Sequence, residues 1–139
     1  MDANIVIAAF LRDSSVRRIL TLSFLELFAP EFLAEEVEAH LPALRSRAGL
    51  SESAARELLH LLEGYVTTIP SDALLLRWEE AEAAMRDIDP RDVAYVAAAL
   101  AVPCDGVWSD DPHLRAQKAV PCWTTSELLR ELREHGLRV

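Results

Sequence analysis

The sequence has little of what membrane-spanning, secreted or disulfide-stabilised proteins require. It contains only two cysteines in 139 residues, and neither has the nearby paired histidines of a zinc site. We expect Cys104 and Cys122 to be reduced and mostly buried thiols. No apolar run reaches the about 18 residues of a membrane span, and no secretory signal opens the chain. These absences predict a cytoplasmic protein.

Basic residues are also scarce. Lys plus Arg number 14 against 23 Asp plus Glu, which gives a formal net charge of −9. Because Lys and Arg make most contacts to phosphate groups, this balance argues against a nucleic-acid-binding protein. Bound divalent cations would offset part of the negative charge where a substrate docks. Basic side chains also cluster locally, at Arg12, Arg17 and Arg18 and at Arg45 and Arg47.

The length and the order of the expected elements indicate one α/β domain over residues 1–139. Short apolar or β-branched segments alternate with amphipathic ones, which is typical of a parallel sheet covered by helices. We expect strands near residues 25–29, 65–69, 106–109 and 120–123. We expect helices near residues 4–11, 14–22, 30–46, 51–64, 71–86, 90–102, 111–117 and 126–135.

The N-terminus is short for a fold of this kind. An acid near the N-terminus of a parallel α/β domain normally follows a first strand, but only Met1 precedes Asp2. We therefore expect the first strand to be shortened or missing. Either the start codon has been assigned too late, or the domain has a reduced sheet.

Four acidic residues lie near the junctions between expected strands and helices: Asp2, Glu36, Asp92 and Asp111. Clustered carboxylates repel one another, so a fold that gathers them usually does so to hold a divalent cation. Asp111 follows an expected strand at its carboxyl end, where open α/β sheets bind their ligands. Ser109 can hydrogen-bond to a carboxylate or a phosphate there, and Asn4 can orient Asp2 in the same way.

Each acid also has an ordinary structural interpretation. Glu36 and Glu38 flank the apolar stripe of their helix on opposite sides, and helix geometry favours Glu36 while leaving Glu38 open. Asp92 and Asp111 stand at the starts of helices, where a carboxylate can cap the helix or favour its dipole without any catalysis. Asp2 lies too near the terminus to be judged by pattern. Only the four acids together, in this order, indicate a site.

Four segments together resemble the PIN-domain family, small α/β nucleases that include the toxins of VapBC-type toxin–antitoxin pairs. DANIVIAAF is similar to the family's Asp-x-Asn motif, and APEFLAEEVEAH to the segment that carries its Glu. DIDPRDVAYVAAAL resembles the helix with the third acid, and WSDD the Thr/Ser-x-Asp motif. The resemblance covers essentially the whole chain apart from the first strand. It implies a three-layer α/β/α fold around a central, mostly parallel sheet.

The resemblance also implies an activity. PIN domains cleave RNA with one or two Mg²⁺ or Mn²⁺ ions held by carboxylates. Matched motif by motif, the resemblance assigns catalysis and metal binding to Asp2, Glu36, Asp92 and Asp111, and supporting roles to Asn4 and Ser109. It predicts an endoribonuclease acting on single-stranded RNA, a homodimer, no membrane partner, and an antitoxin partner where the chain serves as a toxin.

Other functions are consistent with some of the same residues. A PIN-like module that binds RNA or protein without cutting is the main alternative, given the short N-terminus and the net charge of −9. An aspartyl phosphatase needs Asp-x-Asp where this chain has Asp2-Ala3-Asn4. A response-regulator receiver needs a lysine after a late strand, whereas Lys118, the only lysine, follows an expected helix.

Overall fold

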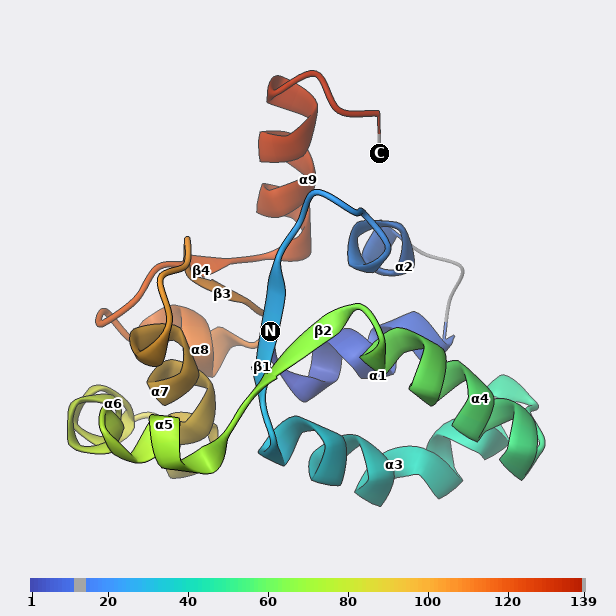
Figure 1. The fold of residues 1–139 in the computed structure, drawn as a ribbon, viewed down its shortest axis with the longest axis horizontal. Coiled ribbons are helices and arrows are strands. Elements are labelled where there is room, and N and C mark those ends of the chain that lie inside the picture. Colours follow the sequence, from blue (N-terminus) through green and yellow to red (C-terminus); the bar gives the residue numbers. More distant parts are fainter. Residues whose placement is uncertain (12–14, 139) are drawn as a thin grey trace.

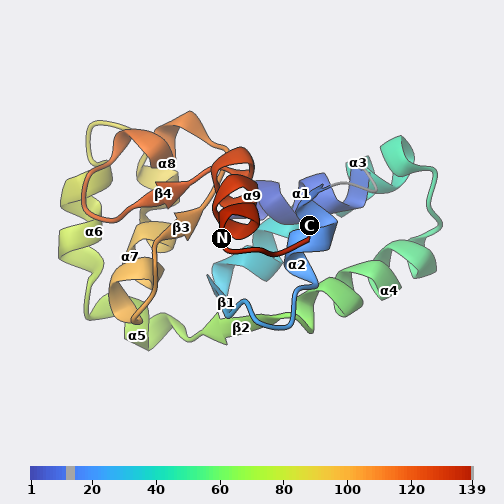
Figure 2. The same cartoon turned by 90° about the horizontal axis from the view of Figure 1, so that it is seen from above.

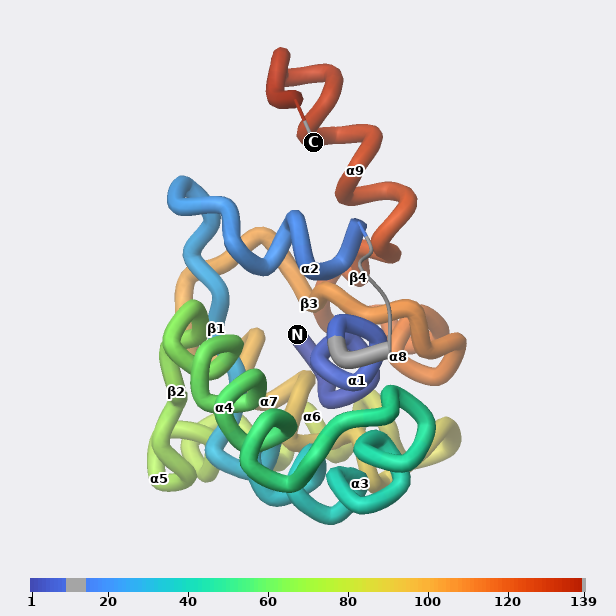
Figure 3. Tube along the Cα trace, turned by 90° about the vertical axis from the view of Figure 1, so that its right-hand side faces the viewer, coloured from blue at the N-terminus to red at the C-terminus, as the bar shows by residue number. Residues whose placement is uncertain are grey.

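A computed structural model gives the conformation of residues 1–11 and 15–138. Two strand pairs lie between two groups of helices, and the last helix projects away from the rest (Figures 1 and 3). The helices of this part of the chain are α1 (Ala3–Leu11), α2 (Ser15–Leu20), α3 (Phe32–Ala48), α4 (Glu52–Glu63), α5 (Ser71–Leu75), α6 (Trp78–Met85), α7 (Val93–Ala101), α8 (Pro112–Ala116) and α9 (Thr125–Glu134), with a 3-10 turn η1 (Pro90–Asp92) before α7.

The strands form two separate parallel pairs within the described residues. β1 (Leu27–Pro30) pairs with β2 (Val66–Ile69), with Leu27 opposite Val66. β3 (Val107–Trp108) pairs with β4 (Cys122–Trp123), with Val107 opposite Cys122. The four predicted strands are therefore present and parallel, but they are short and do not join into one continuous sheet. The α/β fold class is confirmed.

The polypeptide enters the fold between the two strand pairs. No strand precedes α1 among the described residues, as expected from the short N-terminus. The amino group of Met1 donates a hydrogen bond to the carbonyl oxygen of Phe28 in β1 (3.1 Å). The N-terminus lies near the middle of the molecule in all three views (Figures 1, 2 and 3). A cavity of about 550 Å³ lies beside it, lined by residues of both pairs that include Phe28, Val107 and Trp108.

Local capping explains several helix boundaries. The Ser51 hydroxyl accepts a hydrogen bond from the Ala54 amide (3.2 Å) and begins α4, as predicted. Gly49 ends α3 in the left-handed conformation, with φ 67°, which glycine adopts without steric cost. Thr124 and Glu127 form a capping box at the start of α9. The sequence alone places these boundaries to within a few residues.

One predicted helix is wrong. Residues 71–86 form two helices, α5 and α6, instead of one. Arg77 leaves the helical conformation at this break, with φ −118° and ψ 10°. Its guanidinium donates to the carbonyl oxygen of Leu100 near the end of α7 (2.9 Å) and pairs with Glu80 (2.6 Å). These tertiary contacts fix a turn that local sequence preference does not reveal.

Helix α7 forms the centre of the core. Its first six residues, Val93 to Ala98, are all buried, and its small alanines let α6 and β1 pack closely against it. The start of this helix is therefore held inside the molecule, which fixes the position of Asp92 just before it. Among the described residues, no helix combines the length and the apolar character needed to cross a bilayer.

Candidate metal-binding active site

Ser109 joins two of the predicted acids, which lie far apart in the sequence. Its hydroxyl donates to the Asp2 carboxylate and accepts a hydrogen bond from the Asp111 amide (3.0 Å). Asp2 is only 2% exposed, and its other oxygen accepts from the Ile5 amide at the start of α1 (3.3 Å). Burial raises the pKa of Asp2, and Asp111 adds to the rise, while the hydrogen bond from Ser109, the N-terminal ammonium group and the hydrogen bond from Ile5 oppose it.

Asp111 fills the capping role that the sequence left open for it. Its side chain accepts from the His113 amide (2.9 Å) at the start of α8. This uses one carboxylate oxygen and leaves the charge of the group in place. Capping and metal binding are therefore compatible at this residue, since a carboxylate offers several acceptor positions.

Contacts with other helices separate Glu36 from Glu38. Glu36 is partly buried and accepts a hydrogen bond from the hydroxyl of Tyr95 in α7. Glu38 is exposed and pairs with Arg56 of α4 (2.6 Å). Of the two, only Glu36 is turned toward the start of α7, where Asp92 lies. The preference for Glu36 is supported by this geometry.

Asp92 lies close enough to the other predicted acids to interact electrostatically with each of them. It is the residue just before α7, but its side chain makes no capping hydrogen bond. Burial raises its pKa to about 6, with further contributions from the carboxylates of Asp111, Asp89, Asp2 and Glu36. Within residues 1–11 and 15–138, no lysine or arginine forms an ion pair with Asp92 or with the other three predicted acids. Its negative charge is therefore poorly compensated by the protein.

Asp89 and His113 lie beside Asp92 and were not predicted to belong to the site. Asp89, Asp92 and His113 are the one group of three in the described chain whose potential ligand atoms all lie within 4.8 Å of one another. Asp89 is already engaged, because it accepts from the Arg91 amide (3.0 Å) and from the Arg91 guanidinium (3.1 Å). These contacts lower the pKa of Asp89 to about 2. We interpret Asp89 chiefly as the cap of η1.

The four predicted ligands therefore lie in one region of the molecule but do not surround one common point. Among the described residues, no three of Asp2, Glu36, Asp92 and Asp111 have carboxylate oxygens that all lie within 4.8 Å of one another. Hydrated Mg²⁺ and Mn²⁺ keep several waters and reach protein carboxylates partly through them. Ligation of one ion by all four acids thus requires bridging water or small side-chain movements.

Asn4 does not play the part expected of it toward Asp2. It is exposed on α1, and the hydrogen bonds that orient Asp2 come from Ser109 and Ile5. Asp2 precedes α1 and accepts from the Ile5 amide, whereas Asn4 lies within the helix and is exposed. A role of Asn4 toward a substrate phosphate stays a prediction.

A family model described as the PIN domain matches residues 1–133. The chain belongs to the PIN-domain family. No curated protein and no solved structure is similar enough to give a match. PIN domains are generally nucleases and typically use divalent metals. The match therefore supports a nuclease-type function, and the acidic residues described above provide a group that could bind the metal.

The donor set of this PIN domain suits a hard divalent cation. Carboxylates dominate it, with one hydroxyl in support, and Mg²⁺ and Mn²⁺ prefer such oxygen ligands. Burial and mutual repulsion raise the pKa values of Asp2 and Asp92, as expected where negative charges gather without a cation. Asp2, Glu36, Asp92 and Asp111 would hold the ion, directly or through water.

Sequence analysis missed Tyr95 and gave His113 no role. His113 places its Nδ1 3.2 Å from Asp89 and 3.6 Å from Asp111, which depends on how α8 packs and has no signal in the sequence. Tyr95 did have a signal. It is a lone polar side chain in the apolar segment VAYVAAALA, three residues after Asp92, and a buried tyrosine usually finds a hydrogen-bond partner.

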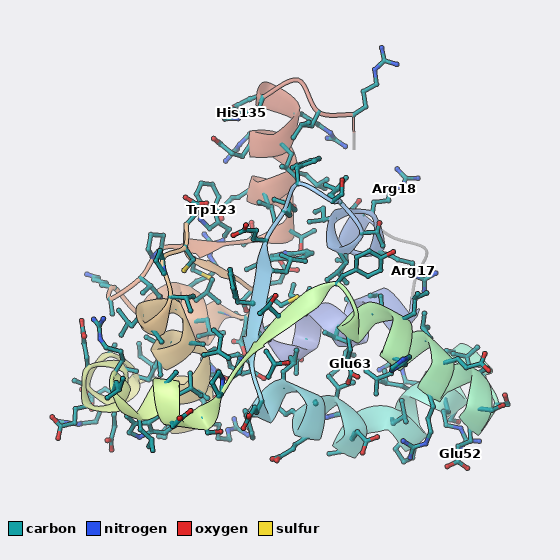
Figure 4. All side chains as sticks on the ribbon, in the orientation of Figure 1. Arg17, Arg18, Glu52, Glu63, Trp123 and His135 are labelled. Atoms are coloured by element: carbon teal, nitrogen blue, oxygen red, sulfur yellow. The ribbon has the colours of Figure 1, made fainter. Side chains whose placement is uncertain are left out.

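Among the basic residues singled out in the sequence, Arg17 and Arg18 make no ion pair with the predicted acids in the part of the chain that the structure describes; Arg91 pairs with Asp89 beside the site (3.1 Å). Arg17 donates to the Ala9 carbonyl oxygen (3.1 Å), which holds α2 against α1. Figure 4 shows Arg17 and Arg18 beside α2, at the edge of the molecule. Arg12 lies outside the described residues. An RNA substrate would thus depend on the bound cation, and on residues around the site, for charge compensation.

Proposed function

We propose that this protein is an Mg²⁺- or Mn²⁺-dependent endoribonuclease that cleaves single-stranded RNA. The observation that supports this most strongly is the hydrogen-bonded link from Asp2 through Ser109 to Asp111. It brings the first and fourth family acids together across most of the chain. Asp92 then adds a third carboxylate close enough to interact with both.

The residues of the site have separable roles in this proposal. A bound divalent ion supplies a water of lowered pKa and screens charge on the phosphate. Asp2, Asp92 and Asp111 hold the ion, and Glu36 completes the set. Ser109 fixes the carboxylate of Asp2. Water adds to the phosphorus and the bond to the 3′-oxygen breaks, which leaves a 5′-phosphate and a 3′-hydroxyl.

The substrate, the oligomeric state and the protein partner are part of the same proposal. We propose RNA as substrate, a homodimer as the working form, and a cytoplasmic location. Where the protein acts as the toxin of a toxin–antitoxin pair, an antitoxin segment would enter the acidic site. A cationic side chain at that position would compensate the charge of Asp92, as a metal ion does.

A second candidate function is a PIN-like module that binds RNA or protein without cutting. The observation in its favour is that the four predicted ligands do not form a compact group of three. Calorimetric titration with Mn²⁺ separates the two candidates. Saturable binding supports the nuclease, whereas only weak, nonspecific heat supports the inactive module.

The substitution Asp92→Asn tests the proposed activity. It removes the charge at the centre of the site with almost no change in shape, so cleavage of single-stranded RNA in Mn²⁺ should fall at least about 100-fold, the upper range for losing even an indirect ligand partner. Asp87→Asn is the matched control, because Asp87 is exposed and makes no side-chain hydrogen bond within the described chain. Equal cleavage by wild type and Asp92→Asn, each purified until free of contaminating nuclease, would refute the mechanism.

A further inference from the structure

Glu36 depends on a single side chain for its position. Among the described residues, the only hydrogen bond to its carboxylate comes from the Tyr95 hydroxyl, and no basic side chain pairs with it. Two of the other three predicted ligands are held by backbone amides instead. Asp2 accepts from the Ile5 amide and Asp111 from the His113 amide, both at the starts of helices.

Position in the helix explains this difference. The first amides of a helix have no partner within the helix and are free to bind a carboxylate. Glu36 lies beyond the first turn of α3, where amides are used by the helix itself. A carboxylate at such a position needs a donor from another element. Tyr95 of α7 supplies it.

Tyr95 is itself held firmly. It is only 3% exposed and lies within the buried part of α7. Its ring packs against Phe32, with centroids 6.2 Å apart and planes tilted by 53°, a favourable aromatic arrangement. Phe32 lies four residues before Glu36, on the same face of α3. The tyrosine therefore contacts α3 at two points one turn apart.

Tyr95 also connects Glu36 to the other acids. It follows Asp92, the residue just before α7, by three positions, so the two residues lie within about one turn of each other along the chain. A rigid ring on α7 thus sets where the flexible carboxylate of α3 lies relative to Asp92. Without this contact, a glutamate that is only partly buried would sample several rotamers.

We propose that Tyr95 is a positioning residue that fixes Glu36 as a metal ligand. This inference rests on the proposed function, because it requires a divalent cation at the acids. The hydroxyl donates to one oxygen of Glu36 and leaves the other free for the ion or its water. Hydrogen bonds of this kind orient ligands, and their loss typically weakens metal binding about 10- to 100-fold.

The substitution Tyr95→Phe removes only the hydroxyl. We expect calorimetry to show Mn²⁺ binding about 10- to 100-fold weaker than in wild type. Tyr65→Phe is the matched control, since Tyr65 is the other tyrosine of the chain and is 43% exposed. It should bind Mn²⁺ as wild type does. Thermal unfolding in EDTA checks that each variant is folded before its affinity is compared.

A double-mutant cycle with Glu36→Gln distinguishes positioning from a general structural effect. If Tyr95 acts through Glu36, adding Tyr95→Phe to Glu36→Gln causes no further loss of Mn²⁺ affinity. Additive losses would overturn the inference. Unchanged affinity in Tyr95→Phe, with normal binding by wild type, would overturn the inference and leave the proposed function intact. Absence of Mn²⁺ binding by wild type would instead overturn both.

A measurement on the unmodified protein covers the case in which Tyr95→Phe does not fold. Selective isotope labelling of tyrosine gives signals from only two side chains. Because Mn²⁺ is paramagnetic, stoichiometric Mn²⁺ should broaden the Tyr95 ring signals more strongly than those of Tyr65. Equal broadening of both, or of neither, would contradict a cation held beside the Tyr95–Glu36 pair.

Discussion

Asp110 and Asp111 are neighbours in the sequence but belong to different regions of the molecule. The Asp110 carboxylate accepts from the amide of Thr125 (2.8 Å) and from its hydroxyl (2.7 Å) at the start of α9. The Asp111 carboxylate instead accepts from the His113 amide at the start of α8 and lies close enough to Asp92 to raise the pKa of that acid. One peptide unit therefore separates a carboxylate that stabilises the fold from one that we assign to metal binding.

The two regions treat negative charge in opposite ways. At the start of α9, hydrogen bonds from the Thr124 amide and from Arg115 lower the pKa of Glu127 to about 2. In the acidic site, burial and neighbouring carboxylates raise the pKa of Asp92 to about 6. Donors surround the first carboxylate and other acceptors surround the second. Only the second group gains from a bound cation.

The comparison shows which property marks a functional acid in this fold. A position at the start of a helix does not mark a functional acid, because Asp89, Asp111 and Glu127 all accept hydrogen bonds from amides at helix starts. The distinguishing property is negative charge that the protein leaves without enough donors or cations. By this measure Asp92 stands apart, because its pKa is raised and its side chain caps no helix. Burial also raises the pKa of Asp2, although Asp2 accepts two hydrogen bonds.

The largest expected effect comes from a pair of matched substitutions at the neighbouring acids. Asp111→Asn keeps a good helix cap, since asparagine caps about as well as aspartate, but it removes one ligand charge. We expect RNA cleavage to fall at least about 100-fold, with little change in the free energy of unfolding. Asp110→Asn should leave cleavage intact and lower the free energy of unfolding by about 1 kcal/mol, because one acceptor is lost.

Cleavage rates and urea denaturation of both variants provide the measurement. Equal loss of activity in the two variants would show that the two regions are not functionally distinct. A large loss of stability in Asp111→Asn, with wild-type activity, would make Asp111 a structural cap only.

Much of the fold could be predicted from the sequence because its signals are local. Ser51 and Gly49 mark helix boundaries through their own backbone and side-chain chemistry. The strands of the β1–β2 and β3–β4 pairs are apolar or β-branched. The break between α5 and α6 could not be predicted, because Arg77 reaches a carbonyl 23 residues away. The division of the strands into two pairs likewise depends on tertiary packing.

The site shows the same limit. The four acids were selected by their motifs, and their joint role stays a prediction. The hydrogen bond from Ser109 to a carboxylate was anticipated. The choice between Glu36 and Glu38 needed the structure, because Arg56 and Tyr95 come from other helices. Asn4 was misjudged as the partner of Asp2, since the donor is 107 residues away at Ser109.

A smaller effect should appear in the pH dependence of the metal-free protein. The folded-state pKa of Asp92 is raised to about 6, so its protonation stabilises the fold, and this stability is lost as pH rises through about 6. Glu127, with its pKa lowered to about 2, contributes stability that is present above its unfolded pKa and lost as pH falls toward 2.

Thermal unfolding in EDTA between pH 7 and about pH 2 tests this contrast. Relative to Asp92→Asn, wild type should gain stability on acidification from pH 7 to about pH 5. Glu127→Gln should differ from wild type in slope only below about pH 4. Identical slopes for wild type and Asp92→Asn between pH 7 and pH 5 would show that Asp92 carries no uncompensated charge.

The most direct test is a crystal soaked in Mn²⁺ and measured at a wavelength where manganese scatters anomalously. A carboxylate cluster that lacks a lysine or arginine partner should show an anomalous peak among Asp2, Asp92 and Asp111, with Glu36 reaching it directly or through water. Absence of any peak in that space, or a single peak elsewhere on the surface, would contradict the account.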